Sequence, residues 1–156
     1  WRADTCHAPI FADPVSTVKA EKLRPVLGKL HTLKPNRLEA ELLSGVPITG
    51  TDSLHRAAQT LLETGLHRVF ISLGADGVYA ADQSGSVTLP APKAEMVSTT
   101  GCGDSFMAAL TWAYLQGSDL ERSARAGLAA SSLTMESAET IHPSMSEAEL
   151  LRRMAL

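Results

Sequence analysis

Hydrophobic residues recur with helical spacing more clearly in one segment of the chain than in any other. Between residues 52 and 64 the apolar side chains fall three and four positions apart, at Leu54, Ala57, Ala58, Leu61 and Leu62. This spacing places them on one face and predicts an amphipathic helix over 52–64. Thr51 can cap the beginning of this helix, and Gly65 can end it.

Short apolar runs bounded by turn residues predict buried strands. These runs lie at 9–12, 31–33, 68–73 and 95–97, and the segments 78–81 and 86–89 have the pattern of a hairpin. Further helices are predicted over 19–30 (where Pro25 is unfavourable), 37–44, 105–116, 118–135 and from 146 towards the C-terminus. Because strands alternate with helices, we expect an α/β fold with a mostly parallel sheet covered on both faces.

Two features of the predicted helices add detail. The segment 105–116 is apolar on almost every side, which is typical of a central helix. Three helix starts combine a capping residue with a glutamate three positions later, as in a capping box. The three pairs are Asn36 with Glu39, Ser118 with Glu121, and Ser146 with Glu149.

Composition narrows the class of protein. The chain has 156 residues, which predicts a single domain over 1–156. Its net charge is −3 and its basic residues are scattered, so we expect no nucleic acid polymer and no membrane as partner. Cys6 and Cys102 lack the spacing of a disulfide framework or zinc site, which favours a cytoplasmic location. The chain begins with Trp1 rather than Met, so we expect it to be part of a longer protein.

The strongest candidate for chemistry is the glycine-rich run 99–104 (TTGCGD), directly before the apolar helix. Glycines here let backbone N–H groups converge at a helix N-terminus, where the helix dipole also favours an anion. Asp104 is placed to accept a proton from a hydroxyl that attacks a bound phosphoryl group. The alternative is a tight turn with Asp104 as a helix cap. The run is not a dinucleotide-binding fingerprint, because Phe106 occupies the third glycine position.

Two further segments are candidates, each with a structural alternative. Asn36 and Glu39 lie one turn apart at a helix start and could orient Mg²⁺-bound water and phosphate oxygens. The same pair could instead be only a capping box. The turn 72–77 (SLGADG) follows a strand, at the edge where open α/β sheets bind ligands. It could equally be a plain turn.

These three signals, in this order, resemble the carboxyl-terminal half of the PfkB-type, or ribokinase-like, carbohydrate kinases. Residues 99–106 (TTGCGDSF) are similar to the family's T-x-G-A-G-D-x-F signature, with Cys102 in place of the usual alanine. Residues 34–41 (KPNRLEAE) are similar to K-P-N-x-x-E-A-E, and 72–78 (SLGADGV) to T-L-G-x-x-G-V. The resemblance runs from about Pro9 to the end of the chain. It implies a ribokinase-like, doubly covered and mostly parallel sheet, without the family's lid.

The resemblance also implies roles for the motif residues. Asp104 would be the catalytic base, and an anion hole would be formed by the amides of Gly101, Cys102 and Gly103. Asn36 would serve the phosphates and Glu39 would serve Mg²⁺ through water. ATP would be bound by the turn made of Ser72, Leu73, Gly74, Ala75, Asp76 and Gly77. Many relatives have an aspartate at Ser98 that helps to bind a monovalent cation, so the serine makes a cation requirement doubtful.

The implied reaction is ATP-dependent phosphorylation of a primary hydroxyl of a sugar or nucleoside. Residues 13–16 (DPVS) and 31–36 (HTLKPN) are most similar to the pseudouridine kinases, which implies pseudouridine as substrate and its 5′-phosphate as product. One alternative is a kinase for ribose, fructose or adenosine. Another is a nucleotide-binding module without turnover.

The family's small β lid and most of its sugar-contacting residues lie in an amino-terminal half that the 156 residues do not include. We therefore expect the isolated chain to be inactive and its sheet to expose an edge. A homodimer of the full-length protein is possible, because dimers of this family commonly pair through the lid.

Overall fold

The computed structural model describes residues 8–155, so Trp1 and Cys6 lie outside the described residues. The chain divides into two compact units. The first contains the chain up to Gly74 together with Tyr79–Thr88. The second contains Ala75–Val78 and the chain from Leu89 onward.

Five strands form one sheet whose spatial order is also the chain order. They are β1 (Phe11–Ala12), β2 (Thr32–Leu33), β3 (Arg68–Ser72), β4 (Val78–Asp82) and β5 (Gly85–Leu89). β1 pairs with β2 and β2 with β3, both in parallel. Only two residues join β4 to β5, a connection that antiparallel neighbours allow and parallel ones do not. The predicted α/β class and the mostly parallel sheet are confirmed.

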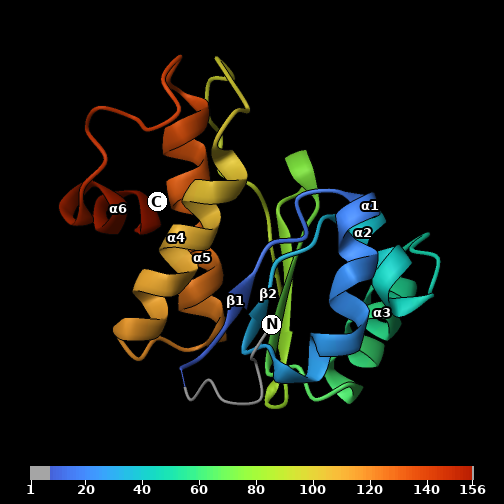
Figure 1. Cartoon of the computed structure of the whole chain (residues 1–156). Helices are drawn as coiled ribbons and strands as arrows, with labels where there is room; N and C mark the ends of the chain where they lie inside the picture. Colours follow the sequence, from blue (N-terminus) through green and yellow to red (C-terminus); the bar gives the residue numbers. More distant parts are fainter. Residues whose placement is uncertain (1–7, 156) are drawn as a thin grey trace. The chain divides into compact units, whose positions relative to one another are not determined.

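One face of this sheet is covered by the helices of the first unit (Figure 1). They are α1 (Thr17–Ala20), the 3₁₀-helix η2 (Glu21–Lys29), α2 (Arg37–Ser44) and α3 (Thr51–Glu63). The predicted helix over 52–64 is α3, displaced by one residue, and its apolar stripe is buried. That stripe packs in one core with Val69 and Ile71 of β3 and with Tyr79 of β4.

The second unit contains α4 (Cys102–Leu115), α5 (Leu120–Met135) and α6 (Glu147–Met154). α4 and α5 lie side by side (Figure 1), and small residues allow the close approach. A Cβ atom at Gly127 would lie 2.3 Å from the ring of Phe106, so only glycine fits there. In the described part of the chain, no helix combines the length and apolar character that crossing a membrane requires.

Several predicted features differ from the structure, among them the start of α3, whose N-cap is Gly50 rather than Thr51. The helix over 19–30 is a single α-turn followed by η2, because Pro25 lacks an N–H group and cannot sit inside a regular α-helix. The predicted strand over 95–97 is absent from the described sheet. Instead, Val97 and Ser98 donate their N–H groups to the Met135 carbonyl at 2.9 and 3.1 Å.

The predicted cap of the helix over 118–135 is also wrong. α5 begins one residue later than a Ser118 cap requires, and the N-cap is Asp119. Its carboxylate accepts the N–H of Arg122 at 2.8 Å. The caps at Asn36 and Ser146 are confirmed, since each side chain accepts the N–H of the glutamate three positions later.

Candidate active site

The turn before α4 depends on a glycine. Gly101 is the N-cap of α4 and has φ of 83°, in the left-handed region that side chains disfavour. A Cβ atom there would lie 2.7 Å from the Thr140 carbonyl oxygen and 2.8 Å from the Thr140 Cγ2 atom. Gly101 therefore permits both the turn and the close approach of residue 140.

The first turn of α4 keeps donors available for an anion. No side chain caps this helix at Gly101, so its first N–H groups lack the usual acceptor. The Cys102 N–H donates to the Thr99 carbonyl at 3.3 Å. Gly103 and Asp104 are therefore better placed than Cys102 to offer free N–H groups to a ligand.

Asp104 lies exposed in this first turn, at one end of a cavity of about 550 Å³. Its neighbour Ser105 shares a 2.6 Å hydrogen bond with the hydroxyl of Thr134, which is fully buried in α5. That bond ties the first turn of α4 to α5 and so holds the backbone of Asp104. An exposed carboxylate on an anchored turn is able to accept a proton from a hydroxyl held within hydrogen-bonding distance.

Cys102 has the surroundings of a space-filling residue. Its Sγ atom lies 3.6 Å from the Ser131 carbonyl oxygen and 3.9 Å from that of Ser98. Burial raises the pKa of the Cys102 thiol above its ordinary value. A raised pKa keeps the thiol protonated, and this argues against a nucleophilic role.

Asn36 and Glu39 form a complete capping box at the beginning of α2. The Glu39 N–H donates to the Asn36 side chain, and the Asn36 N–H donates to the Glu39 Oε2 atom, both at 2.9 Å. Glu39 is only 2% exposed. The structural interpretation of this pair is thus confirmed, and a further role toward Mg²⁺ would have to fall to the second carboxylate oxygen.

The carboxyl ends of β2 and β3 bring the Asn36 pair close to Ser72. Asn36 and Ser72 form a parallel bridge, and the Ser72 N–H donates to the Pro35 carbonyl at 2.9 Å. Asn36, Glu39 and Ser72 thus lie at one edge of the sheet, where open α/β sheets bind ligands.

An ion pair and a strained residue at the ends of β1 and β2 were not predicted as site features. Lys34, which is nearly buried, lies 2.8 Å from the carboxylate of Asp13. Val15 has φ of 66°, a conformation that costs a β-branched residue free energy, and its N–H donates to Asp13 at 3.0 Å. Such strain is concentrated at functional sites. In the sequence, Asp13 was singled out only as part of residues 13–16 (DPVS), which are similar to the pseudouridine kinases.

In the second glycine turn, Gly77 lies close to the backbone of Leu89. Residues Gly74–Asp76 form the 3₁₀-helix η3. Gly77 has φ of 97°, and a Cβ atom there would lie 2.0 Å from the Leu89 carbonyl oxygen. The segment that begins at Leu89 lines a cavity of about 620 Å³, whose walls are Leu89, Pro90, Ala91, Pro92, Lys93, Arg125, Leu128, Ala129, Arg153 and Met154.

The predicted site residues therefore form two groups. The first unit contains Asn36, Glu39, Ser72, Leu73 and Gly74, and the second contains Ala75, Asp76, Gly77 and the run Gly101, Cys102, Gly103 and Asp104. Among residues 8–155, no cluster of three His, Cys, Asp or Glu side chains could hold a metal ion. A single carboxylate is nevertheless compatible with Mg²⁺, which commonly keeps several waters and binds substrate phosphates.

Comparison with known proteins gives consistent matches. The model of the pfkB family of carbohydrate kinases matches residues 2–148. Pseudouridine kinase from Escherichia coli K12 is 39% identical over 153 residues, which are 97% of this chain and 49% of that enzyme. A putative sugar kinase from Clostridium perfringens is 36% identical with a TM-score of 0.92, over 99% of this chain and 48% of that structure.

A structure of Arabidopsis thaliana ribokinase complexed with ribose and ATP is more distant. It is 26% identical with a TM-score of 0.78, over 96% of this chain and 48% of that structure. The chain thus spans about half the length of the relatives it matches. The family match, the fold and the glycine turn before Asp104 agree, and the chain belongs to the pfkB family of carbohydrate kinases.

Proposed function

We propose that this chain supplies the nucleotide-binding and base-bearing half of a kinase that transfers the γ-phosphoryl group of ATP to pseudouridine. The observation that carries the proposal is Asp104, an exposed carboxylate beside the uncapped N-terminus of α4. The nucleoside is chosen because the E. coli relative named pseudouridine kinase matches 97% of the chain. The product would be pseudouridine 5′-phosphate.

Asp104 would accept the proton of the attacking primary hydroxyl. The N–H groups of the first turn of α4 and the helix dipole would stabilise the negative charge on the transferred group. Phosphoryl transfer needs positioning and charge stabilisation more than covalent help from the protein. An exposed base and unpaired donors on one anchored turn meet both requirements.

ATP would occupy the cavity beside the Gly77 turn. Pro90, Ala91 and Leu128 offer apolar surface for a base, while Lys93 and Arg125 offer positive charge for phosphates. Mg²⁺, held through water by Glu39, would neutralise phosphate charge. The Leu128 side chain can pack against an adenine ring but cannot donate a hydrogen bond to it.

A second candidate is a kinase for another sugar. The Arabidopsis relative was solved with ribose and ATP, and it matches 96% of this chain. Ribose, fructose and adenosine therefore belong in the same test. A nucleotide-binding module without turnover is the third candidate.

The test is a phosphorylation assay of the full-length protein that contains these residues. It would be given Mg-ATP with pseudouridine, uridine, ribose, fructose or adenosine, at several KCl concentrations. We expect turnover of pseudouridine without a KCl requirement, because Ser98 lacks a carboxylate. Asp104→Asn should lower kcat by about 10²–10⁴.

Asp119→Asn is the matched control, since asparagine caps a helix about as well as aspartate. Turnover of a different acceptor would reject pseudouridine and keep the mechanism. ATP binding without turnover of any acceptor would favour the module instead.

A further inference from the structure

A further cavity lies on the first unit, between the beginning of α3 and the strands of the hairpin. Its volume is about 680 Å³, which is in the range of small-molecule sites. Every residue that lines it belongs to the first unit, and none is among the residues proposed above for catalysis or ATP binding. The lining consists of Thr51, Asp52, His55, Arg56, Tyr79, Ser86, Val87 and Thr88.

The two strands supply hydroxyl groups to this cavity. Ser86 and Thr88 are two positions apart on β5, so their side chains project from the same face of the strand, and both residues are exposed. Tyr79 of β4 is only 3% exposed, and its hydroxyl shares a 2.7 Å hydrogen bond with the Nδ1 atom of His55. This bond occupies one nitrogen of the imidazole, so the Nε2 atom is the one that remains for a ligand.

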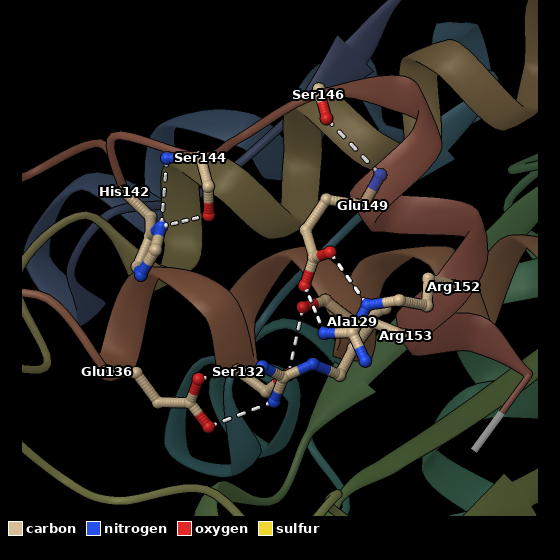
Figure 2. Close-up of polar contacts among 9 residues, drawn as sticks. All are labelled: Ala129, Ser132, Glu136, His142, Ser144, Ser146, Glu149, Arg152 and Arg153. Atoms are coloured by element: carbon tan, nitrogen blue, oxygen red, sulfur yellow. Dashed lines mark hydrogen bonds and ion pairs between the residues drawn. The ribbon is translucent and has the colours of Figure 1, made fainter.

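Two opposite charges of α3 line the cavity without pairing with each other. Asp52 and Arg56 are four positions apart, a spacing that allows an ion pair, and both are exposed. Among residues 8–155, neither side chain has a partner in an ion pair or a hydrogen bond. By contrast, Arg152 of α6 bonds the nearby Glu149 carboxylate at 2.8 Å (Figure 2). The carboxylate of Asp52 and the guanidinium of Arg56 are therefore both available to a ligand.

We propose that this cavity binds a sugar ring with adjacent hydroxyl groups, as a free sugar or as part of a nucleoside. The Asp52 carboxylate can accept two hydrogen bonds from adjacent hydroxyls, and Arg56 can donate to their oxygens. The hydroxyls of Ser86 and Thr88 both donate and accept, as does a sugar hydroxyl. The charges of Asp52 and Arg56 cancel, which favours a ligand without net charge. The site is separate from the proposed reaction, because Asp104 belongs to the second unit.

Other ligands use fewer of these groups. Inorganic phosphate would be repelled by the Asp52 carboxylate beside Arg56. An amino acid could pair its two charges with these side chains but would leave the hydroxyls of Ser86 and Thr88 unused. A protein surface fits poorly, because Val87 is the one wholly apolar side chain of the lining, whereas the centre of a protein interface is depleted of charged residues.

The first experiment is an NMR titration of the 156-residue chain without ATP. The probes are D-ribose and uridine, and 2′,3′-dideoxyuridine is the matched control because it lacks both adjacent hydroxyls. We expect a Kd on the order of 1 mM for uridine, since an open polar site provides little binding free energy per atom. Dideoxyuridine should bind about tenfold more weakly or worse, because hydrogen bonds to a charged group are lost.

The two probes distinguish the two sources of the ring. Equal binding of D-ribose and uridine would identify a free sugar as sufficient, and binding of uridine alone would identify a nucleoside. Tighter binding of inorganic phosphate or L-alanine than of uridine would overturn the proposal. So would the absence of binding by a chain that melts cooperatively.

The second experiment uses variants to locate the bound ring. Asp52→Asn and Arg56→Gln should each raise the Kd of uridine about tenfold. Glu63→Gln is the matched control, because Glu63 is exposed on the same helix and does not line the cavity, and it should leave the Kd unchanged. Measurement of Tm verifies that each variant is folded. An unchanged Kd in folded Asp52→Asn and Arg56→Gln would contradict the proposed site.

The histidine ring nitrogens give a direct readout of the same site. The signals of His55 would be assigned by their loss in His55→Gln, and uridine should shift them. His142 is the internal control, because it belongs to the second unit, and its signals should stay in place. Shifts at His142 without shifts at His55, or shifts at neither, would show that uridine does not occupy this cavity.

Discussion

Gly101 is the residue on which the turn before α4 depends most directly. Gly101→Ala should destabilise the chain, because its φ of 83° disfavours a side chain and its Cβ atom would lie 2.7 Å from the Thr140 carbonyl oxygen. The conformation alone costs about 1–2 kcal/mol, and the contact raises the expected loss to about 3 kcal/mol. Urea unfolding of the two chains measures the difference.

Gly45→Ala separates the cost of the backbone conformation from the cost of the contact with Thr140. Gly45 has φ of 72°, but a Cβ atom there would meet nothing within 4 Å. This control should therefore lose only the conformational part, about 1 kcal/mol. Equal losses for the two variants would show that Thr140 does not press on the turn before α4.

At the residue scale, the sequence predicts chemistry that is local and misses contacts that are distant. Asp104 at the start of a helix and the Asn36–Glu39 box follow from spacing over a few positions, and the structure has both. Thr140 beside Gly101 and the Lys34–Asp13 ion pair join residues more than twenty positions apart. No local pattern predicts such pairs, because the fold brings them together.

Among the elements, α6 is joined to the end of α5 by an ion pair. Arg153 bonds the Glu136 side chain and lowers the pKa of that carboxyl, with further help from the charges of His142 and Arg152. A lowered pKa in the folded state means that folding releases a proton at acid pH. The pair therefore stabilises the fold above the ordinary glutamate pKa of 4.5, and this contribution is lost as pH falls below it.

Glu136→Gln should accordingly lower the Tm at pH 7 by an amount corresponding to about 1 kcal/mol. The difference from the unmodified chain should shrink below pH 4.5 and vanish under more acid conditions, where Glu136 is protonated in both states. Glu139→Gln, at an exposed position of the same segment, is the control and should leave the pH profile unchanged. A pH-independent effect of Glu136→Gln would mean that the carboxylate charge does not hold α6.

The sequence predicts an element well where its hydrophobic spacing and the residues at its ends indicate the same structure. α3 combines a regular apolar stripe with a glycine after its end, and its predicted bounds are one residue from the observed ones. Residues 95–97 have strand composition, yet tertiary hydrogen bonds to Met135 replace strand pairing. Where a backbone partner lies on another element, composition cannot identify it.

At the scale of the whole molecule, the chain has the features of half a fold. In the first unit, the strand at one edge of the sheet, β1, has only two residues. The second unit leaves large apolar side chains exposed, among them Leu115 and Ile141. The chain also spans only 49% of the E. coli relative. Each unit thus has a surface of the kind that further protein usually covers, the strand edge in the first unit and the apolar helix face in the second.

The isolated chain should therefore bind nucleotide and yet transfer no phosphate. Its own residues supply the proposed base, the helix N-terminus and the cavity beside Gly77, whereas by resemblance most contacts to the sugar belong to the other half. Catalysis requires the acceptor hydroxyl to be held within reach of Asp104, and loss of positioning alone can remove several orders of magnitude in rate. Calorimetry with ATP and a phosphorylation assay with all five acceptors test the two parts separately. Turnover by the 156-residue chain alone would mean that it binds the acceptor itself, and the requirement for a second half would then be wrong.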